Sequence, residues 1–123
     1  MEPMRVLFVD DEHDLVSAVV ERLEIRGFAA EGVTSGSEAL ERIESESFDV
    51  VVADVKMPGL DGLQLARIVG QRHPKIRIIL LSGHGSSEDV EEGRRLGVVD
   101  YLQKPIEIET LVELLSGTTK GGL

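Results

Sequence analysis

Acidic side chains that directly follow apolar runs are the residues of this chain best placed to do chemistry. Asp10 and Asp11 come after the run 5–9, and Asp54 comes after the four apolar residues 50–53. An unbroken, β-branched apolar run fits a strand buried on both faces, as in a parallel sheet. Open α/β sheets place their ligand sites at the carboxyl ends of such strands. The alternative for Asp54, considered alone, is that its side chain caps a turn.

A hydroxyl and an amine occupy similar positions after two later apolar runs. Ser82 follows the run 76–81, and Lys104 comes soon after the run 98–102. Because parallel strands all end at one edge of the sheet, we expect these groups to converge with the acids. Clustered carboxylates repel one another, and a hard divalent cation, Mg²⁺ or Mn²⁺, relieves that repulsion. A hydroxyl and an ammonium beside the cation suit a phosphoryl group, whose transfer develops negative charge.

The segments between the apolar runs have helical spacing, so strand and helix alternate five times along the chain. Ser35 and Glu38 form a predicted capping box at the start of the second helix, and Gly27 is placed to end the first. The expected strands are 5–9, 28–33, 50–54, 76–81 and 98–102, and the expected helices contain residues 16–23, 36–43, 63–69, 86–96 and 108–115. Short connections indicate βαβ units, and therefore an α/β fold with a parallel sheet covered by helices on both faces.

The composition excludes several classes of function. The net charge of −10 argues against nucleic-acid binding through this domain, because phosphates would be repelled. Aromatic residues make up only 3% of the chain, too few for a base-stacking platform. The absence of cysteine excludes disulfides and thiolate metal sites. No apolar run approaches the ~20 residues of a membrane span and no signal-peptide pattern opens the chain, so we expect a cytoplasmic protein without membrane association.

In order and spacing, these residues resemble the receiver domain of two-component response regulators. The matching motifs are Asp10-Asp11, Asp54, Met57-Pro58-Gly59, Asp61-Gly62, Ser82, Asp100-Tyr101-Leu102 and Lys104-Pro105. The resemblance implies a flavodoxin-like, doubly wound (βα)5 fold whose five-stranded parallel sheet has the order 2-1-3-4-5. It covers nearly the whole chain, so we expect a receiver domain at residues 1–116 and a flexible tail or the start of a linker at 117–123.

The resemblance also implies how the acids act. Asp54 would accept a phosphoryl group from a phosphohistidine on a histidine kinase or a phosphotransfer protein, and the domain would then signal by switching conformation. Asp11 would bind Mg²⁺ directly and Asp10 mainly through water. Asp54 and the backbone carbonyl of Lys56 would complete the set of protein ligands.

Further roles follow from the same resemblance. Lys104 would pair with the phosphoryl oxygens, Ser82 would move to bond the phosphoryl group, and Tyr101 would swing inward behind it. The Lys104–Pro105 peptide bond would be cis. The domain would catalyse its own phosphorylation and autodephosphorylation, but it would act mainly in signalling. Considered alone, Asp61 is expected to cap the third helix rather than to bind metal.

Two departures from the commonest receiver pattern limit what can be carried over. Lys56 and His84 occupy the variable positions beside the phosphorylation pocket, so the lifetime of the phosphoryl group is not implied. Receivers can also dimerise on phosphorylation through the fourth helix, fifth strand and fifth helix. Here the fifth helix carries the acids Glu107, Glu109 and Glu113 but no Lys or Arg, which disfavours a symmetric, salt-bridged dimer.

Three other functions are alternatives to the receiver. A phosphatase of the haloacid-dehalogenase type also uses an aspartyl nucleophile and Mg²⁺, but it needs a second acid two residues on, where this chain has Lys56. A dinucleotide-binding module would continue the glycines 83 and 85 with a third, and Glu88 stands in its place. A receiver-like domain that signals without phosphorylation would not be expected to keep the full set of site residues.

The first helix is expected to carry a docking surface for the phosphoryl donor. Leu15, Ala18, Arg22 and Ile25 form a stripe about a quarter turn or more away from the face that contains Val16 and Val19. The alternative is that the stripe only widens the buried face. Because Leu15 lies one turn from Asp11, it is expected beside the mouth of the site. The resemblance adds the loop around Pro105 and Ile106 to this surface.

Overall fold

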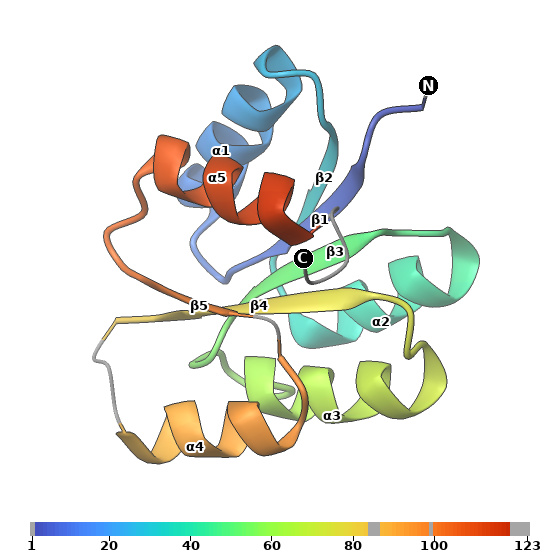
Figure 1. Ribbon diagram of the computed structural model, residues 1–123. Coiled ribbons are helices and arrows are strands. Elements are labelled where there is room, and N and C mark those ends of the chain that lie inside the picture. The colour runs from blue at the N-terminus through green and yellow to red at the C-terminus, as the bar shows by residue number, and fades with distance from the viewer. Residues whose placement is uncertain (1, 84–86, 99, 119–123) are drawn as a thin grey trace.

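The computed structural model describes residues 2–83, 87–98 and 100–118, which form a five-stranded parallel sheet between two layers of helices (Figure 1). The strands are β1 (Arg5–Val9), β2 (Ala29–Val33), β3 (Val50–Asp54), β4 (Arg77–Ser82) and β5 (Asp100–Gln103). The helices are α1 (His13–Ile25), α2 (Gly36–Ser45), α3 (Gly62–Arg72), α4 (Ser87–Arg95) and α5 (Ile108–Thr118). The strand order is β2-β1-β3-β4-β5 with every neighbouring pair parallel, which confirms the predicted α/β fold and strand order.

Strand residues alternate between two hydrophobic clusters, one on each face of the sheet. Helices α1 and α5 cover one face, where Val19, Leu23 and Leu111 belong to the same hydrophobic cluster as Phe8 of β1. Helices α2, α3 and α4 cover the other face, where Leu80 of β4 belongs to the second cluster. The three central strands are almost entirely buried, as their apolar runs predicted. Among the described residues, no helix has the length and apolar composition needed to cross a bilayer.

Several element ends differ from the sequence prediction. Strand β5 begins at Asp100 rather than at residue 98, β4 runs on through Ser82, and α5 continues through Thr118, past the position where its apolar pattern ends. The tail predicted from residue 117 therefore begins inside a helix, and residues 119–123 lie outside the described part of the chain. Gly27 has a φ of +93° just after α1, a conformation that glycine adopts readily, and it ends the helix as predicted.

The capping interactions also depart from the prediction at one helix. Ser35 Oγ accepts a hydrogen bond from the Glu38 N–H, but the Glu38 carboxylate accepts from the hydroxyls of Thr34 and Ser35. These contacts at the start of α2 give one half of the expected capping box. A complete capping box lies at α3, where Asp61 and Gln64 bond each other's backbone N–H. This confirms that Asp61 caps the third helix.

A network of ion pairs joins the start of β1 to β2 and α2. The guanidinium of Arg5 lies 3.0 Å from a Glu31 oxygen and 2.6 Å from a Glu46 oxygen, and Arg42 pairs with the same two acids. Arg5 also lies over the Phe48 ring, 4.9 Å from its centroid. Glu46 follows the last residue of α2, where the helix dipole disfavours an acid, and its two arginine partners compensate for that placement.

Replacing Glu46 should therefore destabilise the protein in a pH-dependent way. The hydrogen bond from Arg5, with the charge of Arg42, lowers the pKa of Glu46 below its ordinary value of 4.5, against a smaller opposing effect of burial. Since the folded-state pKa is depressed, the stabilisation is present above the ordinary value and is lost as pH falls through the folded-state pKa. We expect Glu46→Gln to lower the melting temperature at pH 7, and the difference from wild type to shrink in acid. The exposed Glu41→Gln on α2 is the matched control, and a difference that did not change with pH would contradict the assignment.

Candidate functional site

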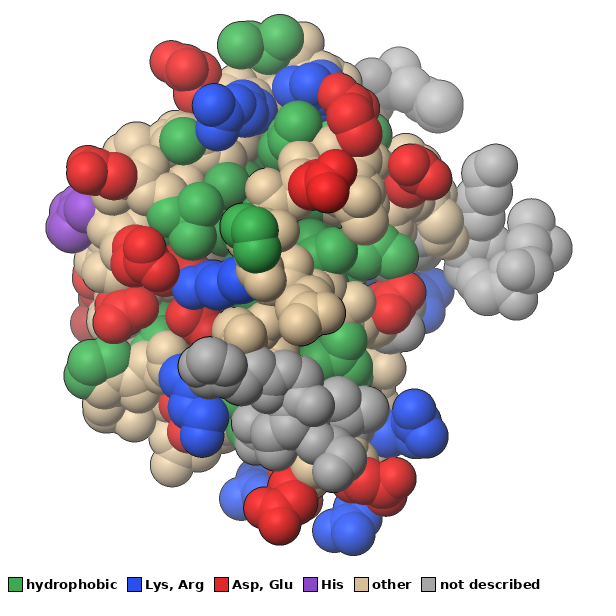
Figure 2. Space-filling model, turned by 90° about the vertical axis from the view of Figure 1, so that its left-hand side faces the viewer, with side chains coloured by type: hydrophobic (Ala, Val, Ile, Leu, Met, Phe, Trp, Pro, Cys, Tyr) green, Lys and Arg blue, Asp and Glu red, His purple; other side chains and the backbone are tan. Residues whose placement is uncertain are grey.

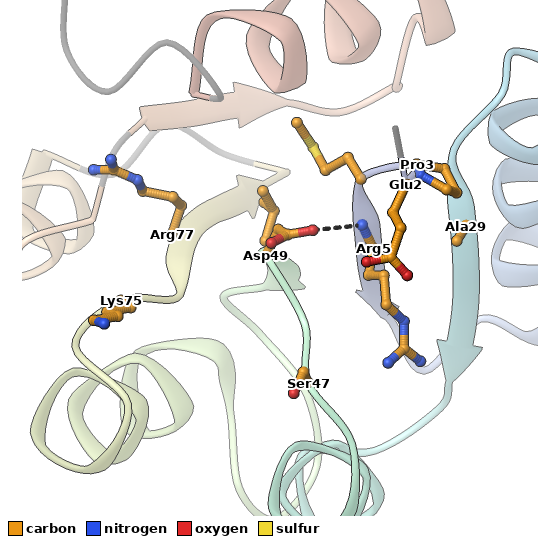
Figure 3. A pocket seen from close by; sticks show the side chains of 10 residues that line it. Glu2, Pro3, Arg5, Ala29, Ser47, Asp49, Lys75 and Arg77 are labelled. Carbon is orange, nitrogen blue, oxygen red and sulfur yellow. Dashed lines mark hydrogen bonds between the residues drawn. The ribbon is translucent and has the colours of Figure 1, made fainter.

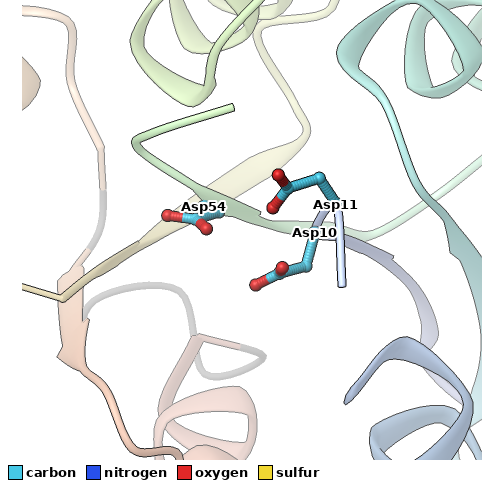
Figure 4. Close-up of side chains that lie close together, drawn as sticks. All are labelled: Asp10, Asp11 and Asp54. Carbon is cyan, nitrogen blue, oxygen red and sulfur yellow. The ribbon is translucent and has the colours of Figure 1, made fainter. Parts of the chain in front are cut away.

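The ends of β1 and β3 bring three aspartates together. Val9 pairs with Ala53 in the sheet, so the residues that follow, Asp10 and Asp54, end neighbouring strands at the same level. Carboxylate oxygens of Asp10, Asp11 and Asp54 all lie within 4.8 Å of one another, and Figure 4 shows the three side chains converging. Asp10 and Asp54 are buried, whereas Asp11 is exposed. The convergence predicted from the sequence is therefore present.

Lys104 reaches this cluster from the loop after β5. The backbone N–H of Lys104 donates to the Ser82 backbone carbonyl at 2.9 Å, which fixes the loop to the end of β4. The Lys104–Pro105 peptide bond is cis, as expected. The Lys104 ammonium lies 2.8 Å from Asp10 Oδ2 and 2.9 Å from Asp54 Oδ2. One positive charge is thus shared between two buried acids from neighbouring strands.

Each buried acid is held by a backbone N–H two residues further along the chain. The Glu12 N–H donates to Asp10 Oδ1 at 3.0 Å, and the Lys56 N–H donates to Asp54 Oδ1 at 3.1 Å. This local arrangement is the one in which an aspartate side chain closes its own turn. It fixes one oxygen of each carboxylate and leaves the other facing Lys104.

The environment changes the pKa of both partners in the central ion pair. Burial raises the pKa of Asp54, and the hydrogen bonds from Lys104 and from the Lys56 backbone offset only part of that rise. Burial alone would lower the pKa of Lys104, but its contacts with Asp10 and Asp54 outweigh this and raise it. Lys104 therefore stays an ammonium at neutral pH.

The donor set fits a divalent cation. Three carboxylates against the one ammonium of Lys104 leave an excess of two negative charges. Asp10 Oδ2 is fully buried, and its partner, the Lys104 ammonium, is shared with Asp54. Carboxylate oxygens are ligands that Mg²⁺ and Mn²⁺ prefer, and the exposed Asp11 leaves one side open to water.

The remaining predicted site residues are placed as follows. Ser82 is buried at the end of β4, and Lys56 presents its side chain to solvent. Tyr101 is half-buried on β5, already packed against the cluster under α4, so its expected inward swing stays a prediction. The roles of the Lys56 carbonyl and the Ser82 hydroxyl also stay predictions, and His84 lies outside the described residues.

Two residues near the site had no role assigned from the sequence. Glu12 Oε1 lies 3.4 Å from the Lys104 ammonium, and the acidic run 10–12 was the signal that could have identified it. Gly62 lies against the backbone of Asp54, where a Cβ would come within 2.2 Å of the Asp54 carbonyl oxygen. Only glycine allows α3 to start so close to the end of β3.

The expected docking residues lie along α1 and in the loop before α5. Figure 2 shows apolar and acidic side chains side by side on one face of the molecule. Leu15, Ala18 and Ile106 are half-buried, and Leu15 and Ile106 pack against the cluster beneath α1 and α5. Arg22 and Pro105 are exposed. The stripe on α1 therefore widens the buried face at Leu15, whereas Ile25, at the far end of the helix, is 76% exposed.

A groove lies at the opposite edge of the sheet, where the strands begin (Figure 3). Residues that start strands line it, including Arg5, Val50 and Arg77. Its side chains are of mixed charge, and the Asp49 carboxylate accepts the Arg5 backbone N–H at 2.8 Å. The groove is thus separate from the acidic cluster.

Known proteins match both the sequence and the structure. The family model of the response regulator receiver domain matches residues 6–116. The chain is 34% identical over 119 residues to the response regulator protein FleR of Pseudomonas aeruginosa, covering 97% of this chain and 25% of FleR. It is 33% identical over 111 residues to the DNA-binding transcriptional regulator NtrC of Escherichia coli, covering 89% of this chain and 24% of NtrC. The crystal structure of a CheY-like response regulator receiver domain protein from Methanospirillum hungatei has a TM-score of 0.93 at 26% identity, covering 97% and 95%. The chain thus spans about a quarter of the two curated relatives.

The surplus negative charge predicts that Mg²⁺ stabilises the folded state. Because the unfolded chain does not hold the three acids together, binding adds about 2.7 kcal/mol when free Mg²⁺ is about 100 times its dissociation constant. We expect millimolar Mg²⁺ to raise the melting temperature at matched ionic strength, and Asp11→Asn to reduce that rise. Asp14→Asn, an exposed change on α1 outside the cluster, should respond like wild type. Identical Mg²⁺ responses in all three proteins would rule out the cation site.

Proposed function

The chain belongs to the response regulator receiver domain family, and from this membership we propose that it accepts a phosphoryl group on Asp54. The donor is a phosphohistidine on a histidine kinase or a histidine phosphotransfer protein, and the reaction depends on Mg²⁺ or Mn²⁺. The observation that carries the proposal is the pairing of the buried Asp54 carboxylate with Lys104 at 2.9 Å beside Asp10 and Asp11. We place the exchange in the cytoplasm, where receivers usually act.

In the proposed transfer, an Asp54 carboxylate oxygen forms a bond to phosphorus while the bond between phosphorus and the histidine nitrogen breaks. The electron pair of the broken bond stays on that nitrogen, and a proton on the other ring nitrogen of the donor lets the imidazole leave as a neutral ring. The Lys56 N–H holds Asp54 Oδ1 at 3.1 Å and keeps the carboxylate oriented. Lys104 lies where negative charge develops on the phosphoryl oxygens, and its fixed position needs little reorganisation during transfer.

Asp10, Asp11, Asp54 and the Lys56 carbonyl would hold the cation, which when bound neutralises phosphoryl charge. Ser82, buried at the end of β4, is the proposed hydroxyl partner of the phosphoryl group, and Tyr101 on the neighbouring strand is the proposed second switch residue. Attack by water on the phosphorus would later return Asp54 to its free form. The domain would thus catalyse its own phosphorylation and dephosphorylation while acting as a signalling element.

Membership of the receiver family sets aside the haloacid-dehalogenase and dinucleotide-binding alternatives. A receiver that signals without phosphorylation remains as the second candidate. The ion pairs of Lys104 with Asp10 and Asp54 argue against it. Two buried acids that share one ammonium group do not favour stability, so a protein that binds no phosphoryl group would gain nothing from them. Since the chain spans about a quarter of FleR and NtrC, any output activity like the DNA binding named for NtrC would reside beyond it.

A further proposal, based on the resemblance to receivers, is a phosphorylation-dependent dimer through α4, β5 and α5. The acids of α5 constrain its form, because Glu109 already pairs with Arg26 of α1 at 2.5 Å. Glu107, just before α5, and Glu113 within it are exposed, and an identical helix facing them would repel them. A dimer of this kind would therefore need basic partners from α4, such as Arg94 and Arg95, rather than from α5.

Phosphorylation should depend on Asp54 and on the divalent cation. We expect wild-type protein treated with acetyl phosphate and Mg²⁺ to shift on a phosphate-affinity gel, and the shift to disappear with a chelator. Asp54→Asn should show no shift, whereas Asp14→Asn should label like wild type. Hydroxylamine, which cleaves acyl phosphates but not phosphoserine, should remove the label. Equal labelling of wild type and Asp54→Asn would refute the assignment.

The docking surface is proposed to comprise Leu15, Ala18, Arg22, Pro105 and Ile106. Leu15, in the first turn of α1, follows Asp11 closely, and Pro105 and Ile106 follow Lys104 in the loop before α5. Ala18 and Arg22 continue the stripe along α1, with Arg22 in its last turn. A phosphohistidine must approach Asp54 from this side. Half-buried apolar side chains beside the mouth of the site would be desolvated by a partner helix, which favours binding there.

Removing these contacts should affect one phosphoryl donor and not the other. We expect Leu15→Ala and Ile106→Ala each to slow transfer from the cognate kinase about tenfold, corresponding to about 1.4 kcal/mol. Labelling by acetyl phosphate should stay unchanged, because the pocket itself is intact. Ile25→Ala is the matched control on the exposed far end of α1 and should alter neither reaction. Loss of both reactions together would mean that the changes damage the fold, and the docking assignment would fail.

A further inference from the structure

Gly93, in the middle of α4, lies directly against the ring of Tyr101. A Cβ built on Gly93 would be 1.8 Å from the Tyr101 hydroxyl oxygen and 2.7 Å from Cζ. Real Cβ atoms do not approach other atoms so closely, so any side chain at this position would overlap the phenol. The phenol of Tyr101 therefore occupies the space that a side chain on α4 would otherwise fill.

The sheet register explains why the phenol points there. Tyr101 on β5 pairs with Leu80 on β4, so the two side chains lie on the same face, beneath α4. Leu80 is fully buried, and its Cδ1 lies 3.2 Å from the position that a Cβ on Gly93 would take. The phenol thus lies beside Leu80 and against the backbone of α4. Because β5 is the edge strand, part of Tyr101 stays exposed.

Glycine is a poor choice for the interior of a helix unless something requires it. It lowers helix stability relative to alanine, and from the sequence alone Gly93 is only a weak point in α4. Gly70 provides the contrast, since it is also within a helix, is exposed, and a Cβ there would make only an ordinary contact at 3.7 Å with the Leu96 carbonyl. Of these two glycines, only Gly93 leaves no room for a side chain.

We propose that Gly93 is a positioning residue that seats Tyr101 on the inner side of β5. The seat is made by the bare backbone at Gly93 and the side chain of Leu80. A methyl group at position 93 would force either the phenol outward or α4 away from the sheet. The seat itself does not depend on the proposed phosphorylation, but its consequence for switching does, because Tyr101 is the proposed switch residue.

The chain offers a direct optical readout of this seat. Tyr101 is the only tyrosine, and there is no tryptophan, so ultraviolet fluorescence reports on this one ring. We expect Gly93→Ala to raise the acrylamide quenching constant of that fluorescence relative to wild type. Gly70→Ala, the matched helical change, should leave quenching as in wild type. Asp54→Asn should do the same, since the seat needs no phosphoryl group.

The melting temperature provides a second measurement, which can be made even if Gly93→Ala is strongly destabilised. With Tyr101 present, Gly93→Ala should lower the melting temperature, whereas Gly70→Ala should raise it by removing a helix glycine. In a Tyr101→Ala background the ring is gone, and Gly93→Ala should then raise the melting temperature too. This change of sign isolates the contact between residues 93 and 101.

Three results would overturn the proposal. The first is equal quenching in wild type and Gly93→Ala with α4 still folded by circular dichroism. The second is stabilisation by Gly93→Ala while Tyr101 is present, and the third is a failure of Tyr101→Ala to reverse its effect. Loss of labelling in the phosphorylation assay with normal quenching would count against the proposed function alone, so the two claims fail separately.

Discussion

The site depends on one ammonium group held between two buried carboxylates. Asp10 and Asp54 end neighbouring strands, and neither could stay ionised inside the protein without a nearby positive charge. Lys104 supplies that charge at 2.8 and 2.9 Å. The pairing is incomplete, because Asp11 adds a third negative charge. A protein that only needed stability would do better with apolar residues here. The excess negative charge fits the proposed function. A bound cation would neutralise it, and the negatively charged phosphoryl group would then bind beside that cation and Lys104.

The backbone around these charged side chains is closely packed and held in place. The sheet places Asp10 and Asp54 at one level, and the start of α3 then comes so close to Asp54 that Gly62 cannot carry a side chain. The same glycine lies one residue after Asp61, which caps α3. The turn that follows Asp54 is thereby fixed at both ends, by the Lys56 N–H at the carboxylate and by the capped helix beyond it. Such rigidity keeps the Asp54 carboxylate in place, as the proposed phosphoryl transfer would require.

The sequence predicted the strands and their convergence because long apolar runs and helical periodicity are local signals. It could not predict which side chains touch. The ion pair of Glu12 with Lys104 joins residues far apart in the chain, and the contact of Gly93 with Tyr101 depends on the register of β4 and β5. The stripe on α1 shows the same limit. A helical wheel treats Leu15 and Ile25 alike, but Leu15 packs against the hydrophobic cluster beneath α1 and α5, whereas Ile25 is exposed. Burial at a helix edge is decided by the neighbouring elements, not by periodicity.

Strand β4 connects the acidic cluster to the face beneath α4. At its end, the backbone carbonyl of Ser82 accepts a hydrogen bond from the backbone N–H of Lys104, so Ser82 anchors the loop that carries the ammonium. Two residues earlier, on the same face of the strand, Leu80 packs beside Tyr101. A displacement of Ser82 therefore acts on two groups at once, the lysine in the site and the packing under α4. The proposed communication between the site and the α4–β5 face would need no long chain of intermediates, because a single strand end belongs to both.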